Sequence, residues 1–270
     1  MLYLSTFTFP GEEAETDFMF NLKTTYDQSV YPYRILPKAG LDEIVFRPVT
    51  ILYGGNGSGK STALNVIAEK LGLKRNSAYN RSRFFESFVN RCQVTLEEAV
   101  PPESRIITSD DVFDMMLDIR SINEGIDRKR EKLAEEYYEL KRERFRISSL
   151  DDLEHLRRIT DARKKTRSRF IEGESGKTVR ERSNGESALM FFQTKIEPDT
   201  LCLLDEPENS LSPENQLVIS THSPFLLAFP GAKIINLDDG SRVVDSWTEL
   251  KNPRVYYDFF KKHADEFEGN

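Results

Sequence analysis

Residues 54–62, GGNGSGKST, combine glycines, a lysine and hydroxyl side chains at a spacing suited to holding phosphate groups. Glycines allow consecutive backbone N–H groups to turn toward an anion without Cβ clashes, and a helix that begins within the segment adds its dipole. In this arrangement the Lys60 ammonium reaches the β- and γ-phosphates, and the Ser61 hydroxyl binds Mg²⁺. An apolar strand precedes the segment and a helix follows it, as G-x-x-x-x-G-K-[ST] requires; the alternative is an ordinary glycine-rich turn. We predict that phosphates are bound by Gly54, Gly55, Asn56, Gly57, Ser58, Gly59, Lys60, Ser61 and Thr62.

Three further segments occur in the second half of the chain: SNGES at 183–187, LCLLDEPENSLS at 201–212 and ISTHSPF at 219–225. Taken singly, each has a structural explanation: a helix cap, a solvated acidic turn and a structural histidine. An Asn-Lys-x-Asp guanine reader does not occur in the sequence, which argues against a GTPase. The charged middle of the chain could imitate the arginine-rich lid of a small-molecule kinase, but that interpretation leaves these segments unexplained.

In this order, behind a phosphate loop, the three segments resemble those of ATP-binding-cassette ATPases. SNGES stands where that family has its Ser-Gly-Gly-Gln signature; Ser183 and Gly185 match, whereas Asn184 and Glu186 differ. The DEPE run and the Thr-His-Ser-Pro sequence are more similar to soluble, stand-alone members than to transporter subunits. These members include the heads of structural-maintenance-of-chromosomes proteins, RecF-like repair ATPases and overcoming-lysogenisation-defect nucleases.

The resemblance implies a role for each polar residue near the phosphates. Asp205 would hold the magnesium shell together with Ser61, and Glu206 would polarise the attacking water as general base. His222 is similar to the switch histidine that contacts the γ-phosphate. The implied catalytic residues are therefore Lys60, Glu206 and His222.

The resemblance also implies a partner subunit. In this family the signature loop, here Ser183 and Gly185, closes over the γ-phosphate bound by the other subunit, and NSLS at 209–212 is similar to the D-loop that crosses to it. We therefore expect an ATP-dependent homodimer. The basic runs at 74–85 and 157–170 could contact nucleic acid, or could be solvated faces paired with neighbouring acids.

Two positions of the family pattern are not matched directly: the glutamine is replaced, and the aromatic residue that would contact adenine has several candidates. The glutamine that follows the strand after the first helix is replaced by IITSDDVF. Asp110 is the candidate for a magnesium- or water-facing residue, with Asp111 next; the alternative is two acidic residues at the start of a helix. An aromatic near the N-terminus would stack on adenine, and the sequence does not choose among Tyr3, Phe7, Tyr31 and Tyr33.

Composition limits the class of protein. The chain has 270 residues, 38% apolar and 31% charged, and a net charge of -7, which argues against a surface that coats nucleic acid or anionic membrane. Its two cysteines do not form a disulfide framework or a zinc site. The sequence shows neither a signal peptide nor a run of about 18 apolar residues. We expect a cytoplasmic protein without a membrane partner.

The pattern of apolar residues predicts the elements. Strands are expected near 2–9, 43–46, 49–53, 105–109, 200–204 and 217–221, and a hairpin across Asp239-Gly240. Between the first two strands, an acidic, turn-rich stretch is expected to about Gly40. Helices are expected after Lys60, with Gly72 as its end, after Ser183, and over 252–267 with Asn252 as N-cap. Between 112 and 180 the composition becomes densely charged, with Ile126, Leu133 and Leu140 spaced by seven and Tyr137 between them, which is typical of a helical lobe.

The link between Glu206 and His222 is unusually short, at fifteen residues. The implied strands are parallel neighbours, and a parallel connection usually contains a helix. A helix of about 10–14 residues does not fit, although an extended segment can just span a five-residue strand. Such a crossover would leave one face of the sheet uncovered, costing roughly 1.5–3 kcal/mol per large side chain. Three explanations stay open: a truncated or deleted sequence, a natural short form with weakened turnover, or another segment that fills the gap.

Together these observations predict an α/β P-loop NTPase of the cassette type, as one domain over 1–270. Its mixed-sheet core would comprise 1–111 and 181–270, and its helical lobe 112–180. We expect an enzyme that binds ATP and Mg²⁺, hydrolyses ATP and acts as a switch through dimer closure. The alternative is a nucleotide-binding interaction module with impaired or no turnover.

Overall fold

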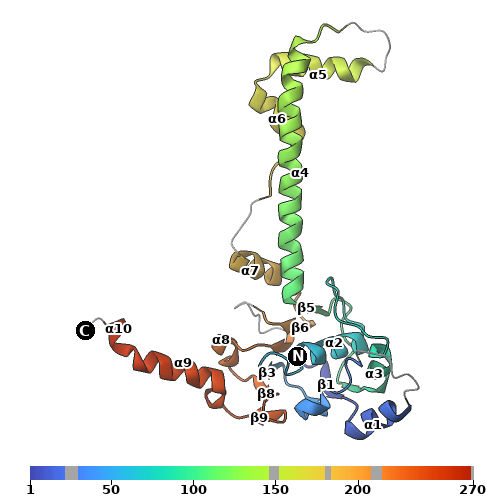
Figure 1. The fold of residues 1–270 in the computed structure, drawn as a ribbon, viewed down its shortest axis with the longest axis vertical. Coiled ribbons are helices and arrows are strands. Elements are labelled where there is room, and N and C mark those ends of the chain that lie inside the picture. The colour runs from blue at the N-terminus through green and yellow to red at the C-terminus, as the bar shows by residue number, and fades with distance from the viewer. Residues whose placement is uncertain (22–29, 146–151, 180–183, 208–214, 269–270) are drawn as a thin grey trace. The chain divides into compact units, whose positions relative to one another are not determined.

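The computed structural model describes residues 1–21, 30–145, 152–179, 184–207 and 215–268. The chain divides into two units, the first formed by Met1–Val112 and Gly185–Asn270 and the second by Phe113–Asn184. The predicted lobe, 112–180, falls almost entirely in the second unit. Figure 1 labels the α-helices and most of the strands.

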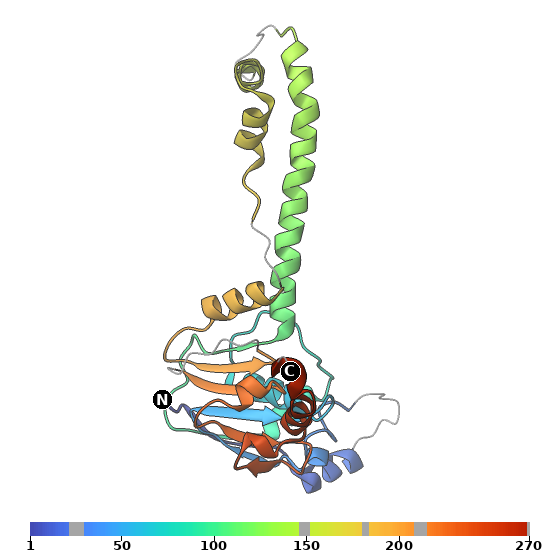
Figure 2. The same cartoon turned by 90° about the vertical axis from the view of Figure 1, so that its left-hand side faces the viewer.

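A six-stranded sheet forms the centre of the first unit. The strand order is β5-β6-β7-β3-β8-β9, in which the first five strands are parallel and β9 runs antiparallel to β8. The strand β3 therefore lies between β7 and β8 (Figure 2). The bounds are β5 Arg105–Ile107, β6 Leu201–Asp205, β7 Gln216–Ser220, β3 Val49–Tyr53, β8 Lys233–Asn236 and β9 Arg242–Val244. The predicted mixed α/β fold is confirmed at this level.

A second sheet has three antiparallel strands in the order β2-β1-β4. These are β2 Glu43–Val45, β1 Leu4–Thr8 and β4 Gln93–Leu96. The buried amide of Gln216 links the two sheets: its Oε1 accepts the backbone N–H groups of Tyr3 and Leu4 at 2.7 and 2.8 Å, and its Nε2 donates to the Leu4 carbonyl at 2.7 Å. The first residue of β7 thus fixes the start of β1.

Helices complete the first unit. The helix α2, Lys60–Leu71, packs against β5, β6 and β7, because its apolar residues recur on one face and join the core that contains Leu203 and Val218. Gly72 ends it in the left-handed region at φ 63°, as the sequence predicts. The other helical segments are α1 Glu12–Asn21, η1 Pro37–Ala39, α3 Phe85–Arg91, α7 Asn184–Lys195, α8 Pro224–Leu227, η2 Trp247–Glu249, α9 Lys251–Lys262 and α10 Ala264–Glu268.

Several local expectations are corrected by the structure. The helix α9 has Leu250 as its N-cap, so Asn252 lies inside the helix and the predicted cap is wrong. The segment before Gly40, predicted to be a turn-rich stretch, contains α1. The hairpin across Asp239-Gly240 is present, because Gly240 adopts the positive φ, 58°, that such a turn requires.

The short connection between β6 and β7 joins two parallel neighbours, paired from Leu201↔Gln216 to Asp205↔Ser220. Residues 208–214 of this connection, including the whole D-loop segment at 209–212, lie outside the described residues. Every residue of β7 is buried, although neighbouring residues of a strand face opposite sides of the sheet. Both faces of β7 are therefore covered, and the expectation of an uncovered face is wrong.

The second unit contains most of α4, Ser109–Arg142, together with α5 Asp152–Lys164 and α6 Arg167–Ser175. Its small core confirms the predicted spacing at Leu133, Tyr137 and Leu140, whereas Ile126 is only half-buried. These side chains pack with Ile159, Ala162 and Phe170. Among the helices described in either unit, we find none that is long and apolar enough to cross a membrane.

Candidate functional site

The glycine-rich segment 54–59 connects β3 to α2 at the carboxyl edge of the parallel strands. Gly57 and Gly59 have φ values of 81° and 98°, which side-chain-bearing residues rarely adopt. A Cβ on Gly54 would lie 2.5 Å from Ser58 Oγ, so this position also requires glycine. The sequence therefore imposes the compact turn that begins α2 at Lys60.

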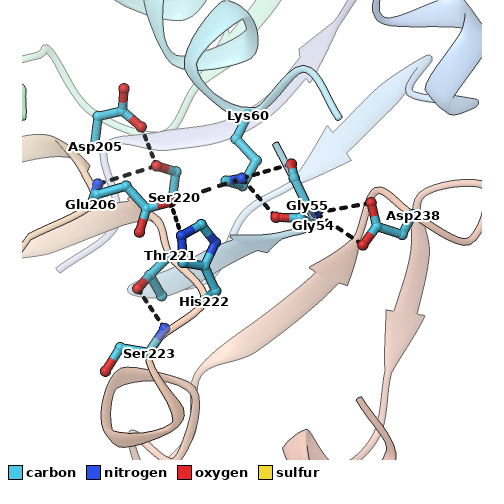
Figure 3. A network of polar contacts seen from close by, with 10 residues as sticks. All are labelled: Gly54, Gly55, Lys60, Asp205, Glu206, Ser220, Thr221, His222, Ser223 and Asp238. Carbon is cyan, nitrogen blue, oxygen red and sulfur yellow. Dashed lines mark hydrogen bonds and ion pairs between the residues drawn. The ribbon is translucent and has the colours of Figure 1, made fainter. Parts of the chain in front are cut away.

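Lys60 is buried at 6% exposure, and its ammonium is held inside the loop (Figure 3). The Nζ atom donates to the Gly54 carbonyl at 2.6 Å and to the Gly55 carbonyl at 3.1 Å. It also lies 3.8 Å from Glu206 Oε1. A cation thus stands between the glycine-rich loop and the end of β6.

The ends of β6 and β7 are joined by polar contacts. Asp205 is paired with Ser220 in the strand register, and the Ser220 hydroxyl donates to Asp205 Oδ1. The next N–H, that of Glu206, donates to the Ser220 carbonyl at 2.9 Å. Glu206 itself has a φ of 51°, so the chain leaves β6 through a left-handed residue, a type of strain that is concentrated at functional sites.

Glu206 makes contact with two basic side chains. Its Oε1 lies 3.3 Å from His222 Nε2 and 3.8 Å from Lys60 Nζ (Figure 3). Burial raises the pKa of the Glu206 carboxyl above its ordinary value; His222 and Lys60 oppose this rise, and Asp205 adds to it. A carboxyl group that has a raised pKa and lies beside a histidine has the properties of a proton acceptor.

A cavity of about 390 Å³ opens in front of these groups. Its lining brings together the loop, the acidic pair and the histidine that the sequence singled out. Gly54 and Gly55 are not among the lining residues. Their carbonyl groups accept hydrogen bonds from the Lys60 ammonium. The lining consists of Ile35, Asn56, Gly57, Ser58, Gly59, Lys60, Ser61, Thr62, Ser109, Asp205, Glu206 and His222.

No model of a known protein family matches this chain, and no curated protein shows significant similarity to it. The chemistry of the site therefore has to be judged from its own residues.

An adjoining cavity, also of about 390 Å³, shares Ser61, Ser109 and Asp205 with the first and includes Asp110. The neighbouring Asp111 is buried and has a different role. Its carboxylate accepts the N–H groups of Ser77 at 2.8 Å and Thr108 at 2.7 Å. Asp110, the first candidate from the sequence, therefore lines the site, while Asp111, the second candidate, holds the start of α4.

The predicted metal ligands, Ser61, Asp205 and Asp110, line this second cavity together. Among the described residues, no group of three or more His, Cys, Asp or Glu side chains could hold a metal ion. Two carboxylates and a hydroxyl are nevertheless the hard oxygen ligands that suit Mg²⁺, which is commonly held by one or two carboxylates and the phosphates of its substrate. The donor set fits magnesium bound together with a nucleotide.

Other predicted residues are not brought to the site. Tyr3, Phe7 and Tyr33 are core residues, at 4%, 0% and 2% exposure, and Tyr31 stacks on Phe85. None of the four aromatic candidates lines the cavity. Gly185 lies in the first turn of α7, whereas Ser183 lies outside the described residues, so the signature segment is not placed relative to the phosphates.

Sequence reasoning missed Asp238, which follows β8. Both of its carboxylate oxygens lie 2.9 Å from the backbone nitrogen of Gly55, which donates to them (Figure 3). An acidic residue after a parallel strand was the available signal, since carboxyl ends of parallel strands gather at one edge of a sheet. Asp238 anchors the glycine-rich loop from the strand beside β3.

The basic run at 74–85 is largely engaged within the first unit. The Arg75 guanidinium lies over the Tyr79 ring, 3.5 Å from its centroid, and donates to Asn65 Oδ1 at 2.8 Å. Glu69 accepts from Tyr79 and pairs with Arg81. In the run at 157–170, Arg158 pairs with Glu136 at 2.7 Å. These contacts favour the interpretation of internally paired charges for those arginines.

Proposed function

We propose that this chain is a P-loop NTPase that binds ATP with Mg²⁺ and hydrolyses it. The observation that carries the proposal is one cavity lined by the glycine-rich loop, Lys60, Asp205, Glu206 and His222. These residues come from three separate parts of the sequence, and a parallel sheet gathers them at its carboxyl edge.

The loop supplies the phosphate-binding groups. Residues 56–59 and the start of α2 line the cavity, and a helix N-terminus favours an anion. The Oγ of Ser58 is buried and has no hydrogen-bond partner among the described residues, so it is free to donate to a phosphate oxygen. Lys60 supplies the balancing charge.

The acidic residues supply the chemistry. Ser61, Asp205 and Asp110 would hold Mg²⁺, which neutralises charge on the phosphates when it is bound. Glu206 would accept a proton from the attacking water, and His222, 3.3 Å away, would orient that carboxylate and the terminal phosphate. This role requires an ionised Glu206, which His222 and Lys60 favour.

The proposed enzyme acts as an intracellular switch through dimer closure on ATP. The resemblance of SNGES and the parallel pairing of β6 with β7 support this part of the proposal. It is tested by measuring the mass of the Glu206→Gln variant with and without ATP. A mass that stays at the monomer value in saturating ATP would exclude closure between two copies.

A second candidate is a nucleotide-binding module without effective turnover. It is favoured by the Lys60 ammonium, whose donors already go to Gly54 and Gly55, and by the short connection after Glu206. Nucleotide would then be bound without the general base reaching a water.

Steady-state ATP hydrolysis separates the two candidates when binding is measured on the same samples. The comparison is between the wild type, Lys60→Ala and Glu206→Gln. Hydrolysis that both substitutions remove, with binding removed only by Lys60→Ala, is expected of the enzyme. Binding with no turnover above that of Glu206→Gln would establish the module instead, and an absence of binding would exclude both.

A further inference from the structure

The helices α9 and α10 present a large apolar face to solvent. Six of their side chains are between 49% and 71% exposed: Val255, Tyr256, Tyr257, Phe259, Phe260 and Phe267. The start of α9 is fixed, since Pro253 is buried and the Asn252 N–H donates to the Tyr53 hydroxyl at 3.2 Å. Every residue from 254 to 262 is exposed. A contiguous exposed face of this kind marks an interaction surface.

The aromatic rings of this face form one line along both helices. Four residues follow one another at intervals of four, three and four positions, which is the spacing of residues on the seam between two paired helices: Tyr256, Phe260, His263 and Phe267. The ring centroids of Phe260 and Phe267 lie 5.7 Å apart. The line of rings, here called the aromatic seam, therefore continues from α9 into α10.

A cavity of about 580 Å³ opens at the start of the aromatic seam. It lies between the first turns of α9, η2 and the start of α8, and it shares no residue with the two cavities around the phosphate loop. The Arg254 Nε, at its edge, already donates to the Thr248 carbonyl at 3.0 Å. The cavity is therefore suited to an apolar ring. Its walls are mainly aromatic rings and prolines, among them Pro224, Trp247, Pro253, Tyr256, Tyr257 and Phe260.

The charges of segment 251–268 favour one class of occupant. Its four basic residues are Lys251, Arg254, Lys261 and Lys262, and its four acidic residues are Asp258, Asp265, Glu266 and Glu268. The segment thus has no net positive charge that would attract an anionic membrane or nucleic acid. Its aromatic side chains are instead of the types enriched in interfaces between proteins.

The order of these charges favours a second copy of the same helices. Lys251 and Arg254 stand at the start of the segment, whereas Asp265 and Glu266 stand near its end. Two copies aligned antiparallel would place the basic start of each beside the acidic end of the other. A parallel alignment would place like charges together, which is unfavourable.

We propose that α9 and α10 pair antiparallel with α9 and α10 of a second copy, across a two-fold axis. Antiparallel pairing brings the partner's Phe267 to the start of α9, where the cavity beside Trp247 and Tyr256 opens. The symmetry places Phe267 of each copy in the cavity of the other, because a two-fold interface uses the same patch on both copies. The contact includes no residue of the phosphate site, so it forms without nucleotide and is separate from the ATP-dependent closure proposed above.

The mass of the full chain, measured by analytical ultracentrifugation at micromolar concentration without nucleotide or Mg²⁺, tests the pairing. We expect twice the mass of one chain. Phe267→Ala empties both cavities and should weaken the dimer by at least about tenfold, because buried aromatic side chains are typical interface hot spots. The matched control is Phe20→Ala, which removes another exposed ring, on α1 and outside the seam and the cavity, and should leave the dimer unchanged. Circular dichroism should show the wild-type helix content for both variants.

Cross-linking tests the antiparallel direction. Asn252 and Glu266 stand near opposite ends of the aromatic seam, and the native Cys92 and Cys202 are buried. Under air oxidation, a mixture of Asn252→Cys chains and Glu266→Cys chains should form disulfide-linked dimers, whereas either variant alone should form far fewer. Efficient linkage within each variant alone would show a parallel pair and would overturn the inference.

Other results would also contradict this interface. A monomer at all concentrations would refute it, and binding of that monomer to anionic lipid vesicles would assign the face to a membrane surface. A dimer that is unchanged by Phe267→Ala would use another surface. A dimer that forms only with ATP would support closure on the nucleotide and refute the pairing of α9 and α10. A nucleotide-free dimer of a chain that binds no ATP would refute the proposed function and leave this inference standing.

Discussion

Glu206 Oε1 lies 3.3 Å from His222 Nε2, and this contact joins the carboxyl ends of two neighbouring parallel strands. The register makes the contact possible, because Asp205 and Ser220 are paired and the two residues lie one and two positions beyond them. The pair does not depend on a helix between the strands. A chain with a short connection can therefore still place the proposed general base beside the histidine.

Hydrolysis should depend on the ionisation of Glu206. Burial raises the pKa of this carboxyl even though His222 and Lys60 favour its charged form. The rate constant kcat should therefore increase with pH along an acid limb that lies above the usual titration range of a carboxyl group. A pH series of kcat measures this limb, which should disappear in Glu206→Gln. A wild-type profile that is flat down to the ordinary carboxyl range would contradict the assignment of Glu206 as the base.

The same raised pKa predicts an effect on stability. A group whose pKa is higher in the folded state contributes stability at low pH, and that contribution is lost as the pH rises through the folded pKa. Glu206→Gln, which stays neutral, should therefore have a higher Tm than the wild type at pH 8 and a similar Tm at low pH. Thermal unfolding at several pH values checks this. A wild type that is more stable than the variant at pH 8 would mean that the pairing with His222 and Lys60 outweighs burial.

Substitution of Asp111 should reduce stability, whereas substitution of Asp110 should affect the magnesium requirement. Asp111→Ala deletes a buried carboxylate that accepts two backbone N–H groups, and should lower the free energy of unfolding by about 2–3 kcal/mol. Asp110→Ala should change it by less than about 0.5 kcal/mol, because Asp110 is exposed. It should instead raise the Mg²⁺ concentration needed for half-maximal hydrolysis. Chemical denaturation and a magnesium titration test the pair, and an unchanged magnesium requirement would remove Asp110 from the metal site.

Gly59 and Gly72 stand at the two ends of α2, both with positive φ. Gly72→Ala adds a methyl group with nothing within 4 Å, so only the left-handed backbone is penalised, at about 1–2 kcal/mol. Gly59→Ala adds contacts at 3.1 and 3.2 Å to Ile35 and Leu36 and should cost about 2–4 kcal/mol. It should also weaken tripolyphosphate binding, which Gly72→Ala should not do. Equal losses of stability would show that the loop relaxes around the added methyl group.

Asp238 should matter to the phosphate loop although it is exposed. Asp238→Ala removes both acceptors of the Gly55 N–H and should lower stability by about 0.5–1.5 kcal/mol, with a several-fold loss of ATP affinity. Asp239→Ala is the control, because that carboxylate pairs with Arg242 on the surface. Calorimetric titration with ATP distinguishes the two. If both variants bind ATP as the wild type does, the anchor is not needed for nucleotide binding.

Local sequence patterns predicted those parts of the site that are formed by residues close together in the sequence. Glycines before Lys60 and the apolar spacing after it determine the loop and α2, and apolar runs ending in Asp205 and before His222 determine two strands. The pairing of β6 with β7 also agreed with the resemblance. The loop, the helix and the two strands depend on residues within a few positions of each other, whereas the pairing of β6 with β7 was given by the resemblance alone.

Features made by distant residues could not be predicted. An acidic residue after a strand could have indicated that Asp238 lies at the carboxyl edge of the sheet, but Asp238 and Gly55 are 183 positions apart and no local pattern pairs them. The aromatic candidates were judged by type alone, whereas Tyr3, Phe7 and Tyr33 are taken up by the core around the small sheet. The helix α1 was missed because its apolar residues do not recur at helical spacing, so packing of Phe18 against Tyr33 determines it more than periodicity does.

The position of β3 has a consequence for how the chain is made. Both of its neighbours, β7 and β8, are translated after residue 215, so the strand that carries the phosphate loop leaves the ribosome long before either partner exists. The hydrogen-bonding groups on one side of β3 lack a partner until β7, Gln216–Ser220, has been made, and those on the other side until β8, Lys233–Asn236, has been made; only then can the sheet close around β3. Nascent chains released earlier should lack the finished loop, so the capacity to hold phosphate is acquired in one late step of synthesis.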